Sequence, residues 1–287
     1  MKESSPSVMS LFVFLAALAP SPSSLLVPLA ALAPLRPPFF VFLAPSRPPF
    51  FVFLAPSRPQ ESAVTKLLKQ GDDAYAKRDQ EGMPAKARDA YRKVIALDET
   101  RVEAYWKIAL VQFWNGTHDK DPEKQQAAFK EGIEFAKIAV SLDEHNKPAR
   151  FWLALLYGLY GQVRGIAQSL HMLDPMKAEL DWILKHDEGF EDAGAHRAYG
   201  RLYFLLPGIK GGDNEKAKKH LARAIELAPK NLLNHLYLAE IQSAEGKKAE
   251  AKASLKTLIE LPDDPRWKPE CAEWRAQARA MLKELEK

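Results

Sequence analysis

The 287-residue chain contains a single cysteine, Cys271, and this scarcity excludes several kinds of site. One cysteine cannot build a disulfide framework or a four-cysteine zinc site. It also leaves the N-terminal region without a cysteine that could carry a lipid. None of the seven histidines stands four residues from another, and no HExxH motif occurs, so the helical zinc signature is missing. We therefore predict no metal and no cofactor.

An excess of basic residues is missing from most of the chain. Residues 1–60 carry four basic residues against one acidic residue, whereas residues 61–287 carry 37 basic and 36 acidic residues. A nucleic-acid-binding domain needs clustered positive charge on its folded part, so nucleic acid is excluded as a partner. No GxSxG motif occurs, and no cysteine–histidine signature surrounds Cys271. The sequence thus predicts a protein that is not an enzyme.

Residues 1–60 also lack glycine, although they hold 12 of the 21 prolines and 8 of the 14 phenylalanines. The letters FFVFLAPSRP occur at 39–48 and again, unchanged, at 50–59. A structural solenoid keeps only its core positions alike and needs turn residues, so this repetition indicates a tandem duplication of sequence. We expect a low-complexity, unpacked segment at 1–60, followed by a helical domain at 61–287.

Three interpretations of this segment stay open. Met9–Ala19 is an apolar run of signal-peptide length that ends in the small-x-small sequence Ala17–Ala19, which would place the protein in the periplasm or cell envelope. A disordered extension or a wrongly assigned start would instead suit a cytoplasmic protein. A membrane span is disfavoured, because no proline-free run approaches the roughly 20 apolar residues that it needs.

From Glu61 onward, apolar residues follow a helical period, and a small residue, a large residue and an apolar residue recur at spacings of four and three. This triplet defines the second helix of each repeat. Its copies are Ala87/Tyr91/Val94, Gly132/Ala136/Ala139, a degenerate Ala178/Trp182/Lys185, Ala217/Leu221/Ala224 and Ala251/Leu255/Leu258.

A first helix precedes each triplet, and small residues stand where the paired helices must approach closely, among them Gly71 and Gly200. The predicted first helices are Ser62–Lys77, Arg101–Trp114, Pro148–Tyr160, Ala193–Leu206 and Leu232–Ala244. Pro269–Glu286 follows as a charged capping helix. The expected fold is all-α: a superhelix of about five helical hairpins plus a capping helix.

This pattern resembles the tetratricopeptide repeat (TPR), most clearly at 195–262, where one repeat has the family's 34-residue length. Residues 191–231, which overlap this region, are similar to the T component of TRAP transporters. The likeness rests on a helix ending in Leu206-Pro207, a loop Gly211-Gly212-Asp213 and a helix opening with Lys216-Ala217.

The resemblance implies a non-catalytic binding scaffold in the periplasm that partners a solute-binding protein. The alternative function is an intracellular TPR adaptor that mediates protein–protein interaction. The expected partner is accordingly a protein, or else a small apolar ligand, and the sequence leaves the oligomeric state open.

Aromatic residues concentrate on the predicted first helices, which line the inner groove in the TPR family. We predict that Trp114, Tyr157, Tyr160 and Tyr203 form an apolar groove for a ligand or peptide. The competing interpretation is that these rings fill the core, because large aromatic side chains contribute much of the burial in a two-helix layer.

Two histidines, His196 and His235, occupy equivalent places in successive first helices. Such positions either line the concave surface, where they would contact a ligand, or pack in the seam between helices. We include both in the predicted groove, and seam packing is the favoured alternative.

Glycines predict two loops. Pro207–Asp213 lacks the ending of a phosphate-binding loop, so we expect Asp213 or Asn214 to cap the next helix. Gly158, Gly161 and Gly165 predict a helix break followed by a longer connection.

Overall fold

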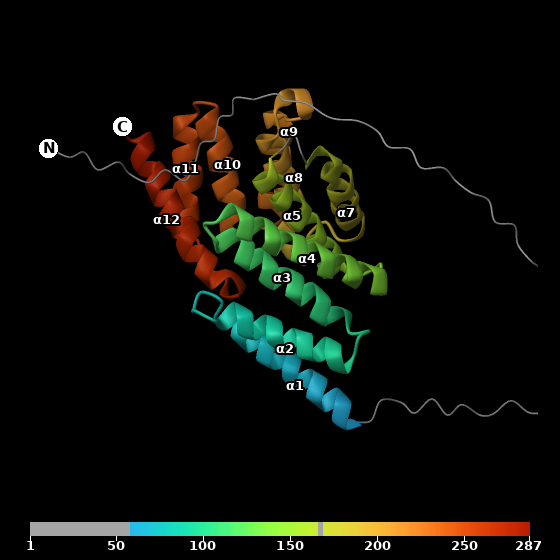
Figure 1. Cartoon of the computed structure of the whole chain (residues 1–287). Helices are drawn as coiled ribbons and strands as arrows, with labels where there is room; N and C mark the ends of the chain where they lie inside the picture. The colour runs from blue at the N-terminus through green and yellow to red at the C-terminus, as the bar shows by residue number, and fades with distance from the viewer. Residues whose placement is uncertain (1–57, 166–168) are drawn as a thin grey trace, which may run out of the picture. The chain divides into compact units, whose positions relative to one another are not determined.

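The computed structural model describes residues 58–165 and 169–287, and every regular element within them is helical (Figure 1). The α-helices form five successive hairpins and a final single helix, which confirms the predicted TPR-type, all-α fold. In chain order they are α1 (Arg58–Tyr75), α2 (Met83–Leu97), α3 (Val102–His118), α4 (Pro122–Leu142), α5 (Lys147–Arg164), α7 (Leu173–His186), α8 (Phe190–Leu205), α9 (Asn214–Leu227), α10 (Leu232–Ala244), α11 (Lys248–Glu260) and α12 (Lys268–Leu285).

Three short 3₁₀ helices join these elements: η1 (Leu170–Met172), η2 (Gly208–Lys210) and η3 (Pro265–Trp267). The export-signal, membrane-span and disordered-segment interpretations concern residues 1–60, and residues 1–57 of that segment lie outside the described residues. No helix in the described part of the chain is both long enough and apolar enough to cross a membrane.

The predicted triplets make the second helices amphipathic, and four of the five are buried as expected. The register predicted for the degenerate triplet Ala178/Trp182/Lys185 is wrong. In α7 the buried residues are Met176, Leu180 and Ile183, whereas Ala178 and Lys185 are exposed. Both sets have spacings of four and three, so periodicity alone could not choose between them. Burial selects the set with three large apolar side chains.

Glycine permits the closest helix contacts. A Cβ atom on Gly71 would lie 2.3 Å from a ring carbon of Tyr91, and one on Gly200 would lie 2.6 Å from Cγ of Leu221. Both glycines therefore serve the close approach that the sequence predicted, the first between α1 and α2 and the second between α8 and α9.

The predicted helix break at Gly158 and Gly161 is wrong. Helix α5 runs on through both residues to Arg164 and ends at Gly165, whose φ of 100° suits glycine. A Cβ on Gly158 would lie 3.1 Å from Cε of Met176. The glycine thus makes room for α7 and does not terminate α5.

Side-chain caps begin several helices. The Asp213 carboxylate accepts a hydrogen bond of 3.0 Å from the Lys216 backbone N–H at the start of α9, and Asp121 accepts one of 2.9 Å from Glu123 at the start of α4. Such bonds satisfy amide groups that have no partner within the helix. The prediction that Asp213 or Asn214 caps the helix is confirmed for Asp213.

The start of α8 contains a left-handed turn that the sequence did not predict. Glu191, Asp192 and Ala193 have φ values of 50°, 55° and 59°, a conformation that costs roughly 1–2 kcal/mol for each residue with a side chain. The right-handed part of α8 therefore begins only after Ala193. Contacts elsewhere in the fold must stabilise this turn.

The last helix returns to the first hairpin. The start of α12 lies beside the turn between α1 and α2, so the two ends of the repeat array meet (Figure 1). The Arg78 side chain in that turn donates from Nε to Oε1 of Glu270 in α12 at 2.9 Å. An open stack of repeats contacts only its neighbours, whereas this domain closes on itself.

Candidate binding site

The segment that leads into α12 covers first-helix residues of the hairpins. Trp267 in η3 packs against Trp152 of α5, with ring centroids 6.1 Å apart. Phe113 of α3 meets the same Trp152 edge-on at 5.2 Å. The inner aromatic surface formed by α3 and α5 is thus contacted by the protein's own C-terminal region.

The Arg78 guanidinium is enclosed by three aromatic rings at the closure. Its central carbon lies 4.8 Å from the ring centroid of Tyr75, 5.2 Å from that of Trp114 and 5.7 Å from that of Trp267. Only 3% of Arg78 is exposed. Its charge is matched by the carboxylate of Glu270, which is also buried. A buried charge needs such a partner, so this pair specifies where α12 docks.

An open cavity of about 360 Å³ lies beside this ion pair. The His118 ring covers Trp114, with centroids 3.5 Å apart, and His118 Nε2 lies 3.2 Å from a Glu273 oxygen. The cavity therefore spans the first hairpin, α3 and α12. Its lining residues are Arg78, Asp79, Gln80, Glu81, Gly82, Pro84, Trp114, His118 and Glu273.

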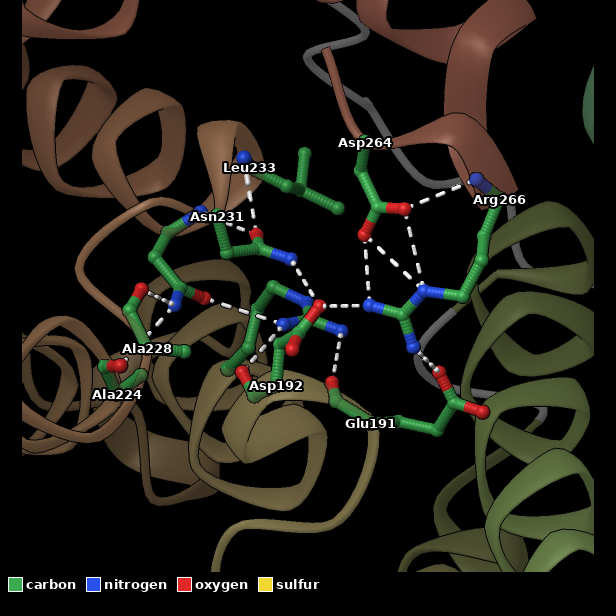
Figure 2. Close-up of polar contacts among 10 residues, drawn as sticks. Glu191, Asp192, Ala224, Ala228, Asn231, Leu233, Asp264 and Arg266 are labelled. Carbon is green, nitrogen blue, oxygen red and sulfur yellow. Dashed lines mark hydrogen bonds and ion pairs between the residues drawn. The ribbon is translucent and has the colours of Figure 1, made fainter. Parts of the chain in front are cut away.

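A second polar network links η3 to the left-handed turn of α8 (Figure 2). The Arg266 guanidinium lies 2.5 Å from an Asp192 carboxylate oxygen and 3.5 Å from one of Glu191. Arg197 donates to the backbone carbonyls of the same two residues, at 3.1 Å and 3.2 Å. These bonds stabilise the turn. Burial raises the pKa of the Glu191 carboxyl, an effect that the charges of Arg266 and Arg197 oppose.

The four aromatic residues of the predicted groove are divided between two places. Tyr157 is buried in the largest core cluster, and Tyr160 and Tyr203 pack against that cluster while remaining partly exposed. Trp114 is buried near Arg78 instead. Groove binding by these residues stays a prediction, and for Tyr157 and Trp114 their burial favours the core interpretation.

Two predicted site residues, His196 and Tyr203, lie in one cluster between α8 and α9. His196 Nδ1 is 2.9 Å from Nδ1 of His220, and its Nε2 is 2.8 Å from an oxygen of Glu188. The Tyr203 ring stacks on the His220 ring, with centroids 5.6 Å apart. These contacts favour seam packing for His196.

The other predicted histidine, His235, lies apart from this cluster in α10. It is 8% exposed, and its Nε2 is 2.8 Å from the Pro229 carbonyl oxygen. This contact ties the helix to the preceding turn, so seam packing is favoured here too. Ligand contact by either histidine stays a prediction.

The histidine cluster shifts two pKa values. Burial, with smaller contributions from His196 and Lys219, lowers the pKa of His220 to about 4. Hydrogen bonds from Arg223 and then from His196 lower the pKa of Glu188 to about 2. At neutral pH, Glu188 is therefore an anion that pairs with the Arg223 guanidinium, and His220 is neutral.

The model of the TRAP transporter T-component family matches residues 74–286, which include both polar networks and the histidine cluster. The chain belongs to this family. Since the match spans most of the described residues, the closure by Arg78 and Glu270 lies within the family region of this T component. No curated protein is significantly similar to it in sequence.

Solved TPR structures share the fold of this T component. TTC0263, a thermophilic TPR protein of Thermus thermophilus, is 20% identical with a TM-score of 0.60, covering 76% of this chain and 98% of that one. PilF of Pseudomonas aeruginosa is 17% identical with a TM-score of 0.52, and the match covers 79% of this chain and 94% of that one. At these identities the likeness shows the fold alone.

The residues that close this T component give no signal in the sequence. Arg78 stands in a turn and Trp267 in a proline-rich break, where helical periodicity carries no signal. An arginine between aromatic residues in space is a pairing that only the tertiary structure reveals. In the described part of the chain, no three histidine, cysteine or acidic side chains gather as a metal site.

Proposed function

We propose that this T component is a non-catalytic scaffold that binds the solute-binding protein of a TRAP-type importer on the periplasmic side of the membrane. The observation that carries the proposal is the family match over residues 74–286. The TPR-type fold supports it, because stacked helical hairpins present extended surfaces for proteins.

The chemistry of the chain also supports a scaffold. Cys271 is fully buried, and this burial raises the pKa of its thiol. The thiolate is the reactive form of cysteine, so this residue is a poor nucleophile. Three polar clusters of the described residues make structural contacts. Arg78 pairs with Glu270, Arg266 pairs with Asp192, and His196 contacts Glu188.

A binding measurement tests the partner. The full chain is immobilised, and the solute-binding protein encoded with the same transporter is titrated over it, with and without its solute. An unrelated solute-binding protein serves as the control. We expect saturable binding of the first protein and none of the second. Equal binding of both, or of neither, contradicts the proposal.

The compartment needs a separate experiment. N-terminal sequencing of the mature chain, purified from cell fractions, shows whether an export signal is removed. We expect a shortened chain in the envelope fraction. An intact Met1 in the cytoplasm contradicts this expectation and supports the alternative, an intracellular TPR adaptor.

A further inference from the structure

One large apolar side chain stands almost fully in solvent. Ile209, in η2 between α8 and α9, is 92% exposed, whereas the other exposed large apolar residues of the described chain reach at most 42%. Leu206, three positions earlier, is buried in the main core cluster. The loop is therefore anchored at its base and projects an isoleucine at its tip.

Backbone bonds hold this loop in a defined shape. The Lys210 N–H donates to the Pro207 carbonyl at 2.8 Å, and the Asp213 N–H donates to the Tyr203 carbonyl at 2.9 Å. Gly211 has a φ of 95°, and a Cβ on Gly212 would lie 1.8 Å from the Leu206 carbonyl oxygen. Two positions thus require glycine to keep this loop in place. A preformed loop loses little conformational entropy when it binds.

The positive charge of Lys210, beside Ile209, indicates the chemistry of the surface that the loop would contact. Lys210 is exposed and has no ion-pair partner among the described residues. Asp213 is occupied as the cap of α9, and Glu215 pairs with Lys218 at 2.6 Å. The tip therefore presents an apolar side chain beside an unmatched cation. An apolar pocket bordered by carboxylates has the complementary chemistry.

The inner side of the superhelix is a less favourable place for a partner. Trp267 already covers Trp152 there, and Arg78 and Glu270 fix the covering segment. Beyond their chain neighbours, no described residue lies within 4 Å of the place where a Cβ on Gly208 or Gly211 would stand, so this part of the chain places no covering segment on the loop tip.

We propose that the loop Pro207–Asp213 is a docking element whose Ile209 inserts into an apolar, carboxylate-bordered pocket on the solute-binding protein. This inference rests on the proposed function and names the surface that performs it. Lys210 contributes electrostatic attraction at the edge of the contact.

The test compares Ile209→Ser with the matched control Ile138→Ser, which makes the same change at a 41%-exposed position on α4. Affinity for the solute-binding protein encoded with the transporter is measured by titration calorimetry. Burying an isoleucine accounts for about a 10-fold to 100-fold change in affinity, so Ile209→Ser is expected to bind that much more weakly. Ile138→Ser should bind like the wild type, and Ile209→Leu should retain most of the affinity.

The outcomes separate this proposal from the proposed function. If the wild type binds and Ile209→Ser binds equally well, the docking loop is wrong while the function stands. If the wild type does not bind, both are wrong. A change from dimer to monomer in Ile209→Ser during sedimentation would assign the loop to self-association and also overturn the proposal. Circular dichroism should show unchanged helicity in each variant, because both side chains are exposed.

Discussion

Arg78 and Glu270 stand 192 positions apart in the sequence and form a buried ion pair, with Arg78 Nε donating to Glu270 Oε1 at 2.9 Å. The pair joins the first hairpin to the last helix. Both residues are at most 5% exposed, so each charge is largely removed from water. The closure of the repeat array thus depends on a contact that is costly to break from one side only.

Removing one partner of this pair should destabilise the domain strongly. We expect Arg78→Ala to lower the free energy of unfolding by about 3–5 kcal/mol, because the Glu270 carboxylate would stay buried without a partner. Lys69→Ala, which removes one end of an exposed pair with Asp73, should cost no more than about 0.5 kcal/mol. Urea unfolding of the two variants measures the difference, and equal losses would contradict the special role of Arg78.

Replacing both charges should be milder than the sum of the single changes. The double variant Arg78→Met with Glu270→Met leaves no unpaired charge, so we expect its loss to be smaller than that of Glu270→Met alone. A double-mutant cycle from urea unfolding provides the comparison. Additive losses would show that the two side chains are not coupled.

A glycine of a helix seam, Gly200, should differ sharply from Gly208 of the loop between α8 and α9. Gly200→Ala would place a Cβ 2.6 Å from Leu221 Cγ and 3.2 Å from the Ala217 carbonyl oxygen, so we expect a loss of about 1–3 kcal/mol. A Cβ on Gly208 would lie within 4 Å of no described residue beyond its chain neighbours, so Gly208→Ala should change stability by less than about 0.5 kcal/mol. Thermal unfolding followed by circular dichroism distinguishes them, and a stable Gly200→Ala would mean that α8 and α9 can separate freely.

Stability should fall on mild acidification because of His220. Its pKa is about 4 in the folded chain and about 6.5 when unfolded, so between these pH values the unfolded chain binds a proton that the folded chain does not. The free energy of unfolding therefore decreases as the pH drops from 6.5 toward 4 and is fully retained above 6.5. Allowing for solvent screening, His220 accounts for about 1 kcal/mol between pH 7.5 and pH 5.

Urea unfolding at pH 7.5 and pH 5 measures this effect, with His220→Gln as the comparison. Glutamine keeps a polar side chain and does not titrate, so the variant should lose less stability between the two pH values than the wild type. The Glu188 carboxylate, with a pKa of about 2, stays ionised in the folded chain at both pH values. In the unfolded chain its ordinary pKa of 4.5 lies below pH 5, so its contribution to the difference is small and is shared by the wild type and the variant. An identical loss in the variant would assign the pH dependence to another group.

Two tyrosines of the predicted groove should respond differently to alanine. Tyr157 is 9% exposed and surrounded by the main core cluster, so Tyr157→Ala should cost about 3 kcal/mol or more. Tyr160 is only partly buried, and we expect Tyr160→Ala to cost less than half as much. Binding of the solute-binding protein, measured on folded Tyr160→Ala, then tests the groove: unchanged affinity would remove Tyr160 from the site.

The helical triplets show how far local pattern determines this fold. Ala217, Leu221 and Ala224 recur as Ala251, Leu255 and Leu258, and both sets are buried as predicted. In α7 the same pattern fits two registers, and only tertiary burial identifies Met176, Leu180 and Ile183. Periodicity thus established the architecture and left one register undetermined.

The contacts that close the domain could not be predicted from the sequence. Glu191 and Asp192 give no local signal for a left-handed turn, because that conformation is maintained by Arg197 and Arg266 from other elements. The sequence likewise predicts only that Ile209 lies in a loop. Its exposure depends on the conformation of that loop, in which Gly211 adopts a positive φ. Long-range pairing and solvent exposure are properties of the assembled domain.

The packing of Trp267 on Trp152 sets a threshold for anything that enters the superhelix. A peptide or apolar molecule that binds that surface competes with a segment of the same chain, whose contact is intramolecular and needs no encounter in solution. Weak ligands therefore do not bind, and only a molecule that binds the Trp152 surface more tightly than Trp267 does can displace Trp267. The covered aromatic surface therefore admits only ligands whose affinity exceeds that of the Trp267 contact, whatever their shape or charge.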